Sequence, residues 1–417
     1  MPLGYPHELD LLDFPNDPLA MLLWRTLSDL LLWWDVEPEL RSSLFLNTPE
    51  SALDANAAPG LAESLRSLAA IYQSPGTIEP GRLADACSGV AEWAEAHGST
   101  EVALQFSEAA ARLDPSSSAR CYTAGRLSRR PGEYQRALTW LRRAIRLARR
   151  ARRSGVDTKN ETDFANAHRG YGFVLADMGN MAEAEPHFWK CVRAARRVGH
   201  KSLAGSGFHD LLLVAVHLER WDDALEYAKN AVELYKVGHP RFPLLAHDVA
   251  FFWTRRGYYS SALPVVERIL PWVKNQREQI LVLATLARCA AAVRDHLRYQ
   301  RVAREIRELA DANAEMAASS LYHVAEGARC FHDWATAEQL GREALAAATA
   351  RQNGTVIQWA ESLLATVADR VPGDYDTIPD DGSIVDATRE LILHKLRRQP
   401  PPEPEALPVP PEKYPVD

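Results

Sequence analysis

A helical repeat between residues 81 and 350 constrains the fold of this chain more than any other feature of its sequence. Each copy contains a helix, a short turn, an aromatic residue and, three residues later, an alanine that opens a second helix. The clearest aromatic/alanine pairs are Tyr134/Ala137, Trp221/Ala224, Tyr259/Ala262 and Trp334/Ala337. Such a period is typical of solenoids, in which each helical hairpin buries its apolar face only against its neighbours.

Seven anchor positions align, although three copies keep only part of the pattern. The anchors are Ala103, Ala137, Ala184, Ala224, Ala262, Tyr299 and Ala337, and successive anchors lie 34, 47, 40, 38, 37 and 38 residues apart. Small or apolar residues follow each anchor at positions +4 and +7, on one stripe of a helix. Because small side chains let two helices approach closely, this stripe predicts tightly packed antiparallel helix pairs.

The pattern resembles the tetratricopeptide repeat family, whose second helix carries a small, an apolar and a small residue at these three positions. The small residue of the family's first helix is matched by Gly125, Gly172, Ala250, Ala287 and Ala325. Copies of about 38–40 residues exceed the family's usual length of 34 and look more like the extended repeats of bacterial signalling regulators. The resemblance implies an all-α fold, a right-handed superhelix of helical hairpins that binds proteins or peptides as a scaffold or adaptor.

The regions outside the repeat complete the expected domain organisation. We predict an N-terminal helical cap subdomain over residues 1–80, a solenoid of seven repeats over 81–353, a capping helix over 354–370, and an acidic loop, a short helix (Asp386–Arg398) and a proline-rich disordered tail over 371–417. The long gap between the second and third anchors predicts an exposed loop at residues 154–162.

An apolar stretch near the N-terminus, Leu19–Trp34, is interrupted by Arg25 and Asp29. It is short for a membrane span, so we expect a buried helix and no membrane contact. Four tryptophans occur early in the chain: Trp24, Trp33, Trp34 and Trp93. They predict either a capping core or a surface for self-association. No secretory signal opens the chain, which favours a cytoplasmic location.

The sequence contains no motif for catalysis. Its five cysteines are far apart and form no CxxC pair, which argues against a structural zinc site and a disulfide framework and favours a reducing compartment. The patterns GxxxxGK[ST], HExxH and GxSxG are all absent. We therefore expect no enzyme activity, no cofactor and no metal ion.

The resemblance also predicts a concave groove, which the first helices of successive hairpins would line. The groove residues expected from it are Asn166, Arg169, Phe173, His209, His217, His247, Phe251, Arg255, Arg288, Tyr322 and Arg329. This mixture of cations, histidines and aromatic rings suits an acidic or aromatic peptide.

The strongest charge feature runs through one repeat and into its second helix. Residues 119–153 contain twelve arginines and one acid, Glu133, a charge of +11 in a chain whose net charge is −7. The arginines expected on the outer face of that helix, here called the arginine ridge, are Arg142, Arg143, Arg146, Arg149, Arg150 and Arg153.

Three interpretations of the arginine ridge compete. It suits the acidic surface of a protein partner, it suits the phosphate backbone of RNA or DNA, and it is compatible with a solvated face. The solvated face is disfavoured because like charges at i+3 and i+4 destabilise a helix. No aromatic row for stacking bases accompanies the arginines. We therefore expect an acidic protein partner, with nucleic acid as the alternative.

Overall fold

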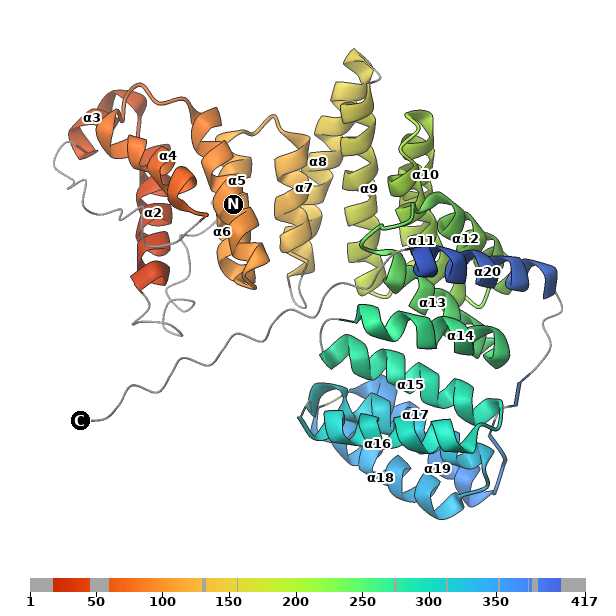
Figure 1. Cartoon of the computed structure of the whole chain (residues 1–417). Helices are drawn as coiled ribbons and strands as arrows, with labels where there is room; N and C mark the ends of the chain where they lie inside the picture. The colour runs from red at the N-terminus through yellow and green to blue at the C-terminus, as the bar shows by residue number, and fades with distance from the viewer. Residues whose placement is uncertain are drawn as a thin grey trace, which may run out of the picture. The chain divides into compact units, whose positions relative to one another are not determined.

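The computed structural model describes residues 18–45, 60–129, 133–155, 157–273, 276–312, 314–351, 353–373, 375–376 and 382–398. Within these residues the chain is all-α, with nineteen α-helices, one short 3-10 helix and no strand (Figure 1). It divides into two compact units, Met1–Gly207 and Phe208–Asp417. The expected proline-rich tail lies outside the described residues.

The first unit is built from consecutive helices. These are α2 (Pro18–Asp35), α3 (Pro38–Phe45), α4 (Ala62–Gln73), α5 (Pro80–Ala96), α6 (Thr100–Leu113), α7 (Ser118–Leu127), α8 (Tyr134–Ser154), α9 (Thr158–Asp177) and α10 (Met181–Arg197). The next helix, α11 (Lys201–His217), contains the boundary between the units.

The second unit continues the same alternation. Its helices are α12 (Trp221–Leu234), α13 (Phe242–Arg255), α14 (Tyr259–Ile269), η2 (Leu270–Trp272), α15 (Gln276–Ala292), α16 (His296–Ala312), α17 (Ala314–Cys330), α18 (Trp334–Ala350), α19 (Gly354–Ala368) and α20 (Gly382–Arg398).

The seven anchors all fall on second helices of hairpins, namely α6, α8, α10, α12, α14, α16 and α18. All seven are buried, as are all seven residues at +7. The +4 residues are buried too, except the half-buried Ala303. The predicted all-α class and the hairpin architecture are therefore confirmed.

The glycine of the first helix accounts for the close approach within a hairpin. A Cβ built on Gly125 in α7 would lie 2.6 Å from Cγ of Leu141, the +4 residue of α8. Real side chains do not approach this closely, so any larger residue at position 125 would push the two helices apart.

The turn inside six of the hairpins has a residue with positive φ at the same position. Five residues before the anchor, φ is positive in six copies, at Gly98, Gly179, Glu219, Gly257, Arg294 and His332. In the seventh copy this position is Gly132, which lies outside the described residues. Glycine adopts such a φ without steric cost, whereas the three other residue types do so at some cost in strain.

The apolar stretch near the N-terminus forms the buried helix that its sequence predicts. Leu23, Leu27, Leu30 and Trp33 of α2 lie in a core shared with α4, α5 and α6, and the Trp33 indole donates to the carbonyl of Pro75 at 2.8 Å. Self-association through the tryptophans stays a prediction. No helix in the described parts of the chain is both long and apolar enough to cross a bilayer.

The expected exposed loop at residues 154–162 is wrong. Helix α8 continues to Ser154 and α9 begins at Thr158, where the Asp157 side chain accepts a hydrogen bond from the Asn160 N–H at 2.7 Å. Glu161 is fully buried. The additional residues therefore lengthen two helices, because Asp157 caps α9 early and a buried partner network holds Glu161.

The C-terminal helix α20 begins at Gly382 rather than at Asp386 and packs against α12 and α14. Val385, Ile392 and Leu396 are fully buried along its inner face. After α19 the chain therefore runs back to the earlier helices α12 and α14 of the second unit and packs α20 against them.

Candidate functional site

The arginine ridge occupies the outer face of α8. Arg142, Arg146, Arg149, Arg150 and Arg153 are exposed, while Leu141, Ala144, Ile145 and Ala148 of the same helix are buried. Among the described residues, Arg146, Arg149, Arg150 and Arg153 form no ion pair with a carboxylate. The guanidinium of Arg142 lies near Tyr171 of α9, with Nε 3.3 Å from the hydroxyl oxygen. The result is a row of guanidinium groups open to an anionic partner.

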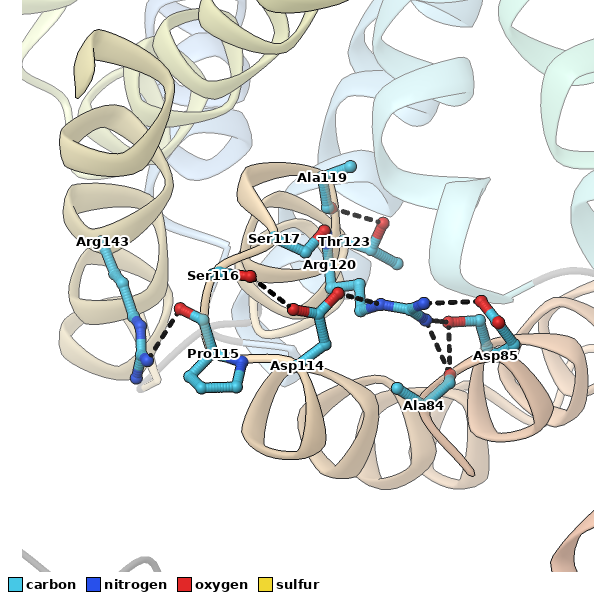
Figure 2. Close-up of polar contacts among 11 residues, drawn as sticks. Ala84, Asp85, Asp114, Pro115, Ser116, Ser117, Ala119, Arg120, Thr123 and Arg143 are labelled. Atoms are coloured by element: carbon cyan, nitrogen blue, oxygen red, sulfur yellow. Dashed lines mark hydrogen bonds and ion pairs between the residues drawn. The ribbon is translucent and has the colours of Figure 1, made fainter. Parts of the chain in front are cut away.

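Other arginines of the same stretch hold the fold together. The Arg120 side chain, which is 17% exposed, donates to the Ala84 carbonyl (2.7 Å), Ser88 (2.6 Å), Asp85 (2.6 Å) and Asp114 (3.2 Å), so it ties α7 to α5 and to the α6–α7 turn (Figure 2).

Arg143 also differs from the rest of the arginine ridge. It is half-buried and donates to the Pro115 carbonyl at 3.0 Å (Figure 2). Arg136 is bound at 2.6 Å through both Nε and Nη2 to the buried carboxylate of Glu108, which also accepts from the Trp140 indole at 2.9 Å. Arg120, Arg136 and Arg143 therefore have a structural role, unlike the exposed arginines of the ridge.

A buried carboxylate fixes the C-terminal end of α8. Glu161 of α9 accepts from Arg152 Nε at 2.7 Å and from Arg197 Nη1 of α10 at 2.9 Å. The Arg152 guanidinium also lies over the Phe164 ring, 4.0 Å from its centroid. Glu161 therefore links α8, α9 and α10, and these contacts hold in place the helix that carries the arginine ridge.

In the first unit, the predicted groove residues Arg169 and Phe173 contact each other. Phe173 is half-buried, and the guanidinium groups of Arg129 and Arg169 both lie 4.8 Å from its centroid. Arg129 also pairs with Asp177 at 2.9 Å. Asn166 is half-buried on the same helix, α9. This cluster is a partly exposed aromatic–cation surface.

In the second unit the predicted groove residues differ in exposure. His217 and Arg255 are exposed, and His247, Phe251, Arg288 and Tyr322 are half-buried. Sequence reasoning did not name Leu244 or Leu281, which are 46% and 38% exposed. Each lies six residues before the small residue of its first helix, Ala250 or Ala287. That register was the signal that would have found them.

His209, predicted as a groove residue, is instead buried. Its Nε2 lies 2.7 Å from Oδ2 of Asp248 in α13. His247 lies 3.5 Å from the other oxygen of Asp248 and 3.2 Å from the Thr285 hydroxyl in α15. Burial acts to raise the pKa of Asp248, yet the hydrogen bonds from the two histidines hold it at about 2. This network connects three successive first helices.

Arg329 is also buried rather than open to a groove. Its Nε and Nη2 donate to the carbonyls of Val371 (3.2 Å) and Pro372 (3.0 Å), and its Nη1 pairs with Glu326 at 2.8 Å. The guanidinium of Arg329 is therefore bound by the segment that follows α19. The repeat pattern could not predict this contact, because the residues are more than 40 positions apart in the sequence.

Among the described residues, no cluster of three or more His, Cys, Asp or Glu side chains is arranged to hold a metal ion. The five cysteines are buried thiols, and burial raises the pKa of Cys289 to about 12.

Comparison with known proteins identifies the repeat. The Tetratricopeptide repeat family model matches residues 163–236. A search of curated proteins finds no match. Among solved structures, RapI in its apo form is 9% identical, covering 87% of this chain and 90% of its own, with a TM-score of 0.46. PilF of Pseudomonas aeruginosa is 19% identical, with coverage of 54% and 91% and a TM-score of 0.42.

BtubC of P. vanneervenii is 15% identical to this chain, covering 54% of it and 90% of its own length, with a TM-score of 0.41. The family model spans most of α9 and all of α10, α11 and α12, where the anchors Ala184 and Ala224 are buried. Residues 163–236 therefore form tetratricopeptide repeats, and the same anchor positions recur in the other hairpins of the described chain.

Proposed function

We propose that the chain is a protein-binding scaffold or adaptor that recruits or regulates a partner with acidic segments. The observation that carries this proposal is the row Arg142, Arg146, Arg149 and Arg153, exposed along one face of α8. The last three of these have no carboxylate partner within the described residues. A carboxylate-rich surface would form charge-assisted hydrogen bonds with these guanidinium groups and relieve their mutual repulsion.

The first-helix face of the second unit offers a chemically different surface. Leu244, Leu281 and Phe251 supply apolar area, while His217 and Arg255 supply polar and cationic groups. This combination suits a peptide with apolar anchors and an acidic end. We place the function in binding rather than catalysis and in the cytoplasm.

The arginine ridge is tested by charge reversal with a matched control. In the test variant Arg142, Arg146, Arg149 and Arg153 are changed to Glu, and in the control Arg268, Arg301, Arg304 and Arg307, which are exposed in the second unit, are changed to Glu. Both variants alter net charge equally. The probe is a fluorescein-labelled poly-glutamate peptide, whose anisotropy is followed at several salt concentrations.

We expect the native chain and the control to bind this peptide with strong salt dependence. The ridge variant should lose roughly tenfold or more in affinity, because four charge-assisted contacts disappear. Equal binding by the ridge variant and the control would overturn the proposal. The same three proteins are then used for affinity capture from the native organism, where partners lost only with the ridge variant are the candidates.

Nucleic acid is separated by a parallel measurement. A labelled single-stranded RNA and a labelled duplex DNA are titrated with the native chain at low salt. If native protein retards the nucleic acid with a steep salt dependence and the ridge variant does not, the ligand of the arginine ridge is a phosphate backbone rather than an acidic protein.

For the groove, replacement of Arg255 and Arg288 by Ala should weaken partner capture without unfolding the chain.

A further inference from the structure

The segment after α19 follows the edge of the second unit where the hairpin turns lie. Its described residues, 371–373 and 375–376, are here called the edge segment. Arg329 near the end of α17 binds its first two carbonyls. The Arg294 guanidinium, in the α15–α16 turn, lies 4.4 Å from the centroid of Tyr375. The Ser260 N–H, at the start of α14, donates to Asp376 at 2.9 Å. The edge segment therefore contacts three consecutive hairpins.

Each contact selects a chemical feature of an extended peptide. Arg329 selects two backbone carbonyls. At Gly373, an added Cβ would lie 2.6 Å from Sγ and 2.9 Å from the backbone nitrogen of Cys330, so only glycine fits. Arg294 favours an aromatic ring through a cation–π contact. The N-terminus of α14 favours a carboxylate, and the Asp376 side chain lies there.

The edge segment lies on the surface, whereas the helix after it is firmly anchored. Val371 and Tyr375 are 45% and 44% exposed. In α20, by contrast, Val385, Ile392 and Leu396 are fully buried. The ammonium of Lys395, itself buried, donates to the carbonyls of Val232 and Tyr235 at the end of α12. The edge segment is thus held by a few contacts with Arg329, Arg294 and Ser260, whereas the helices on either side of it, α19 and α20, are well packed.

A cavity adjoins the edge segment. Its lining includes Arg288, Tyr259, Glu326 and Cys330, and its volume of ≈ 10 Å³ is about that needed by one water molecule. Glu326 and Cys330 are also the residues that Gly373 approaches.

We propose that this edge of the second unit is a peptide-binding site whose resident ligand is the chain's own edge segment. Its external ligand is an extended segment of a partner protein with a glycine, one intervening residue, an aromatic residue and a carboxylate. The two ligands compete, so release of the edge segment regulates access to the site. The inference goes beyond the proposed function, because it concerns the turn edge of the second unit and not the arginine ridge.

The test uses the full chain and a fluorescein-labelled peptide of residues 369–378 as the probe. Gly373→Val should expel the edge segment, since the added side chain collides with the Cys330 backbone. Gly382→Val is the matched control, because nothing lies within 4 Å of a Cβ at Gly382. We expect Gly373→Val to bind the probe roughly tenfold or more tightly than the native chain, whose tethered segment competes at a high effective concentration. The control should bind like the native chain.

A second release variant avoids any change in packing. Tyr375→Ser combined with Asp376→Lys alters only exposed side chains and should also increase probe binding. Adding Arg294→Ala to Gly373→Val should weaken binding severalfold, and a probe with valine at position 373 should not bind. Thermal melting shows whether each variant is folded. If neither folded release variant binds the probe more tightly than the native chain, the edge segment is not an exchangeable ligand and the proposal is wrong.

Discussion

Gly172 in α9 lies directly against Phe188 in α10, so closely that a Cβ on Gly172 would stand 2.8 Å from Cε1 of the ring. Phe188 is the +4 residue after the anchor Ala184. The same relationship joins Gly125 and Leu141 in the preceding hairpin, at 2.6 Å. The repeat pattern therefore encodes a steric fit between the first and second helix of each hairpin.

Gly172→Val should destabilise the first unit by about 1–3 kcal/mol, since the added side chain overpacks the contact with Phe188. The measurement is the opening free energy of α9 and α10 from native-state hydrogen exchange. Gly81→Ala is the control, because a Cβ there meets nothing within 4 Å; it should change stability by less than about 1 kcal/mol. Unchanged exchange in Gly172→Val would mean that Phe188 turns away without cost.

Two substitutions at the turn position five residues before the anchor should change stability in opposite directions. Glu219 and Gly257 occupy it with φ of 55° and 78°. Glu219→Gly should stabilise the second unit by about 0.5–1 kcal/mol, and Gly257→Ala should destabilise it by about 1–2 kcal/mol, because only glycine adopts this φ without strain. Thermal melting compares the two variants. Shifts of the same sign would contradict a shared backbone requirement.

Glu161→Gln should destabilise the helix pair α8–α9 by about 3 kcal/mol. The substitution removes the fully buried negative charge that pairs with Arg152 and Arg197. Urea denaturation followed by tryptophan fluorescence measures the loss. The matched control is Glu338→Gln, which breaks an exposed i,i+4 pair with Arg342 and should cost less than about 0.5 kcal/mol. Equal effects would show that the buried network adds nothing.

The first unit should lose stability below about pH 6.5 because of a buried histidine pair. Nδ1 of His168 lies 3.0 Å from Nδ1 of His187. Burial, with a smaller contribution from nearby positive charge, lowers the pKa of His168 to about 3 and that of His187 to about 4. Between these values and 6.5 the unfolded chain binds protons that the folded chain does not.

The stabilisation from this pair is therefore fully present above pH 6.5 and decreases as the pH falls, by about 2 kcal/mol for each histidine at pH 5. Hydrogen exchange of α9 and α10 at pH 7 and pH 5, expressed as opening free energy, tests this. The variant His168→Leu/His187→Phe should lose much less stability than the native chain on acidification. The same pH dependence in both proteins would rule out the histidine pair as its cause.

Arg146→Glu should separate stability from binding. Residue 146 lies four residues from both Arg142 and Arg150, so a glutamate there replaces repulsion by attraction and should stabilise α8 by about 0.5–1 kcal/mol. The same change should weaken binding of the poly-glutamate probe. Thermal melting and anisotropy on one preparation measure both effects. A loss of stability would show that the native charge row is not strained.

The sequence alone determined the helical hairpins and their register. Anchors such as Ala137 and Ala262 are buried as predicted, because a small residue on a fixed helical stripe is a local requirement of close packing. The exposure of the arginine ridge was equally predictable, since the helical period places Arg142, Arg146, Arg149 and Arg153 opposite the apolar stripe.

Only the tertiary structure decided which polar residues are open to a partner. His209 and Arg329 lie at positions predicted for the groove, yet both are buried. His209 binds Asp248, and Arg329 donates to the carbonyls of Val371 and Pro372. The sequence predicts a loop at Glu161, whereas in the structure Glu161 lies in α9 and pairs with Arg152 and Arg197. These contacts join residues on different helices, so they depend on how the hairpins stack and where the chain returns. Local periodicity contains no information about either.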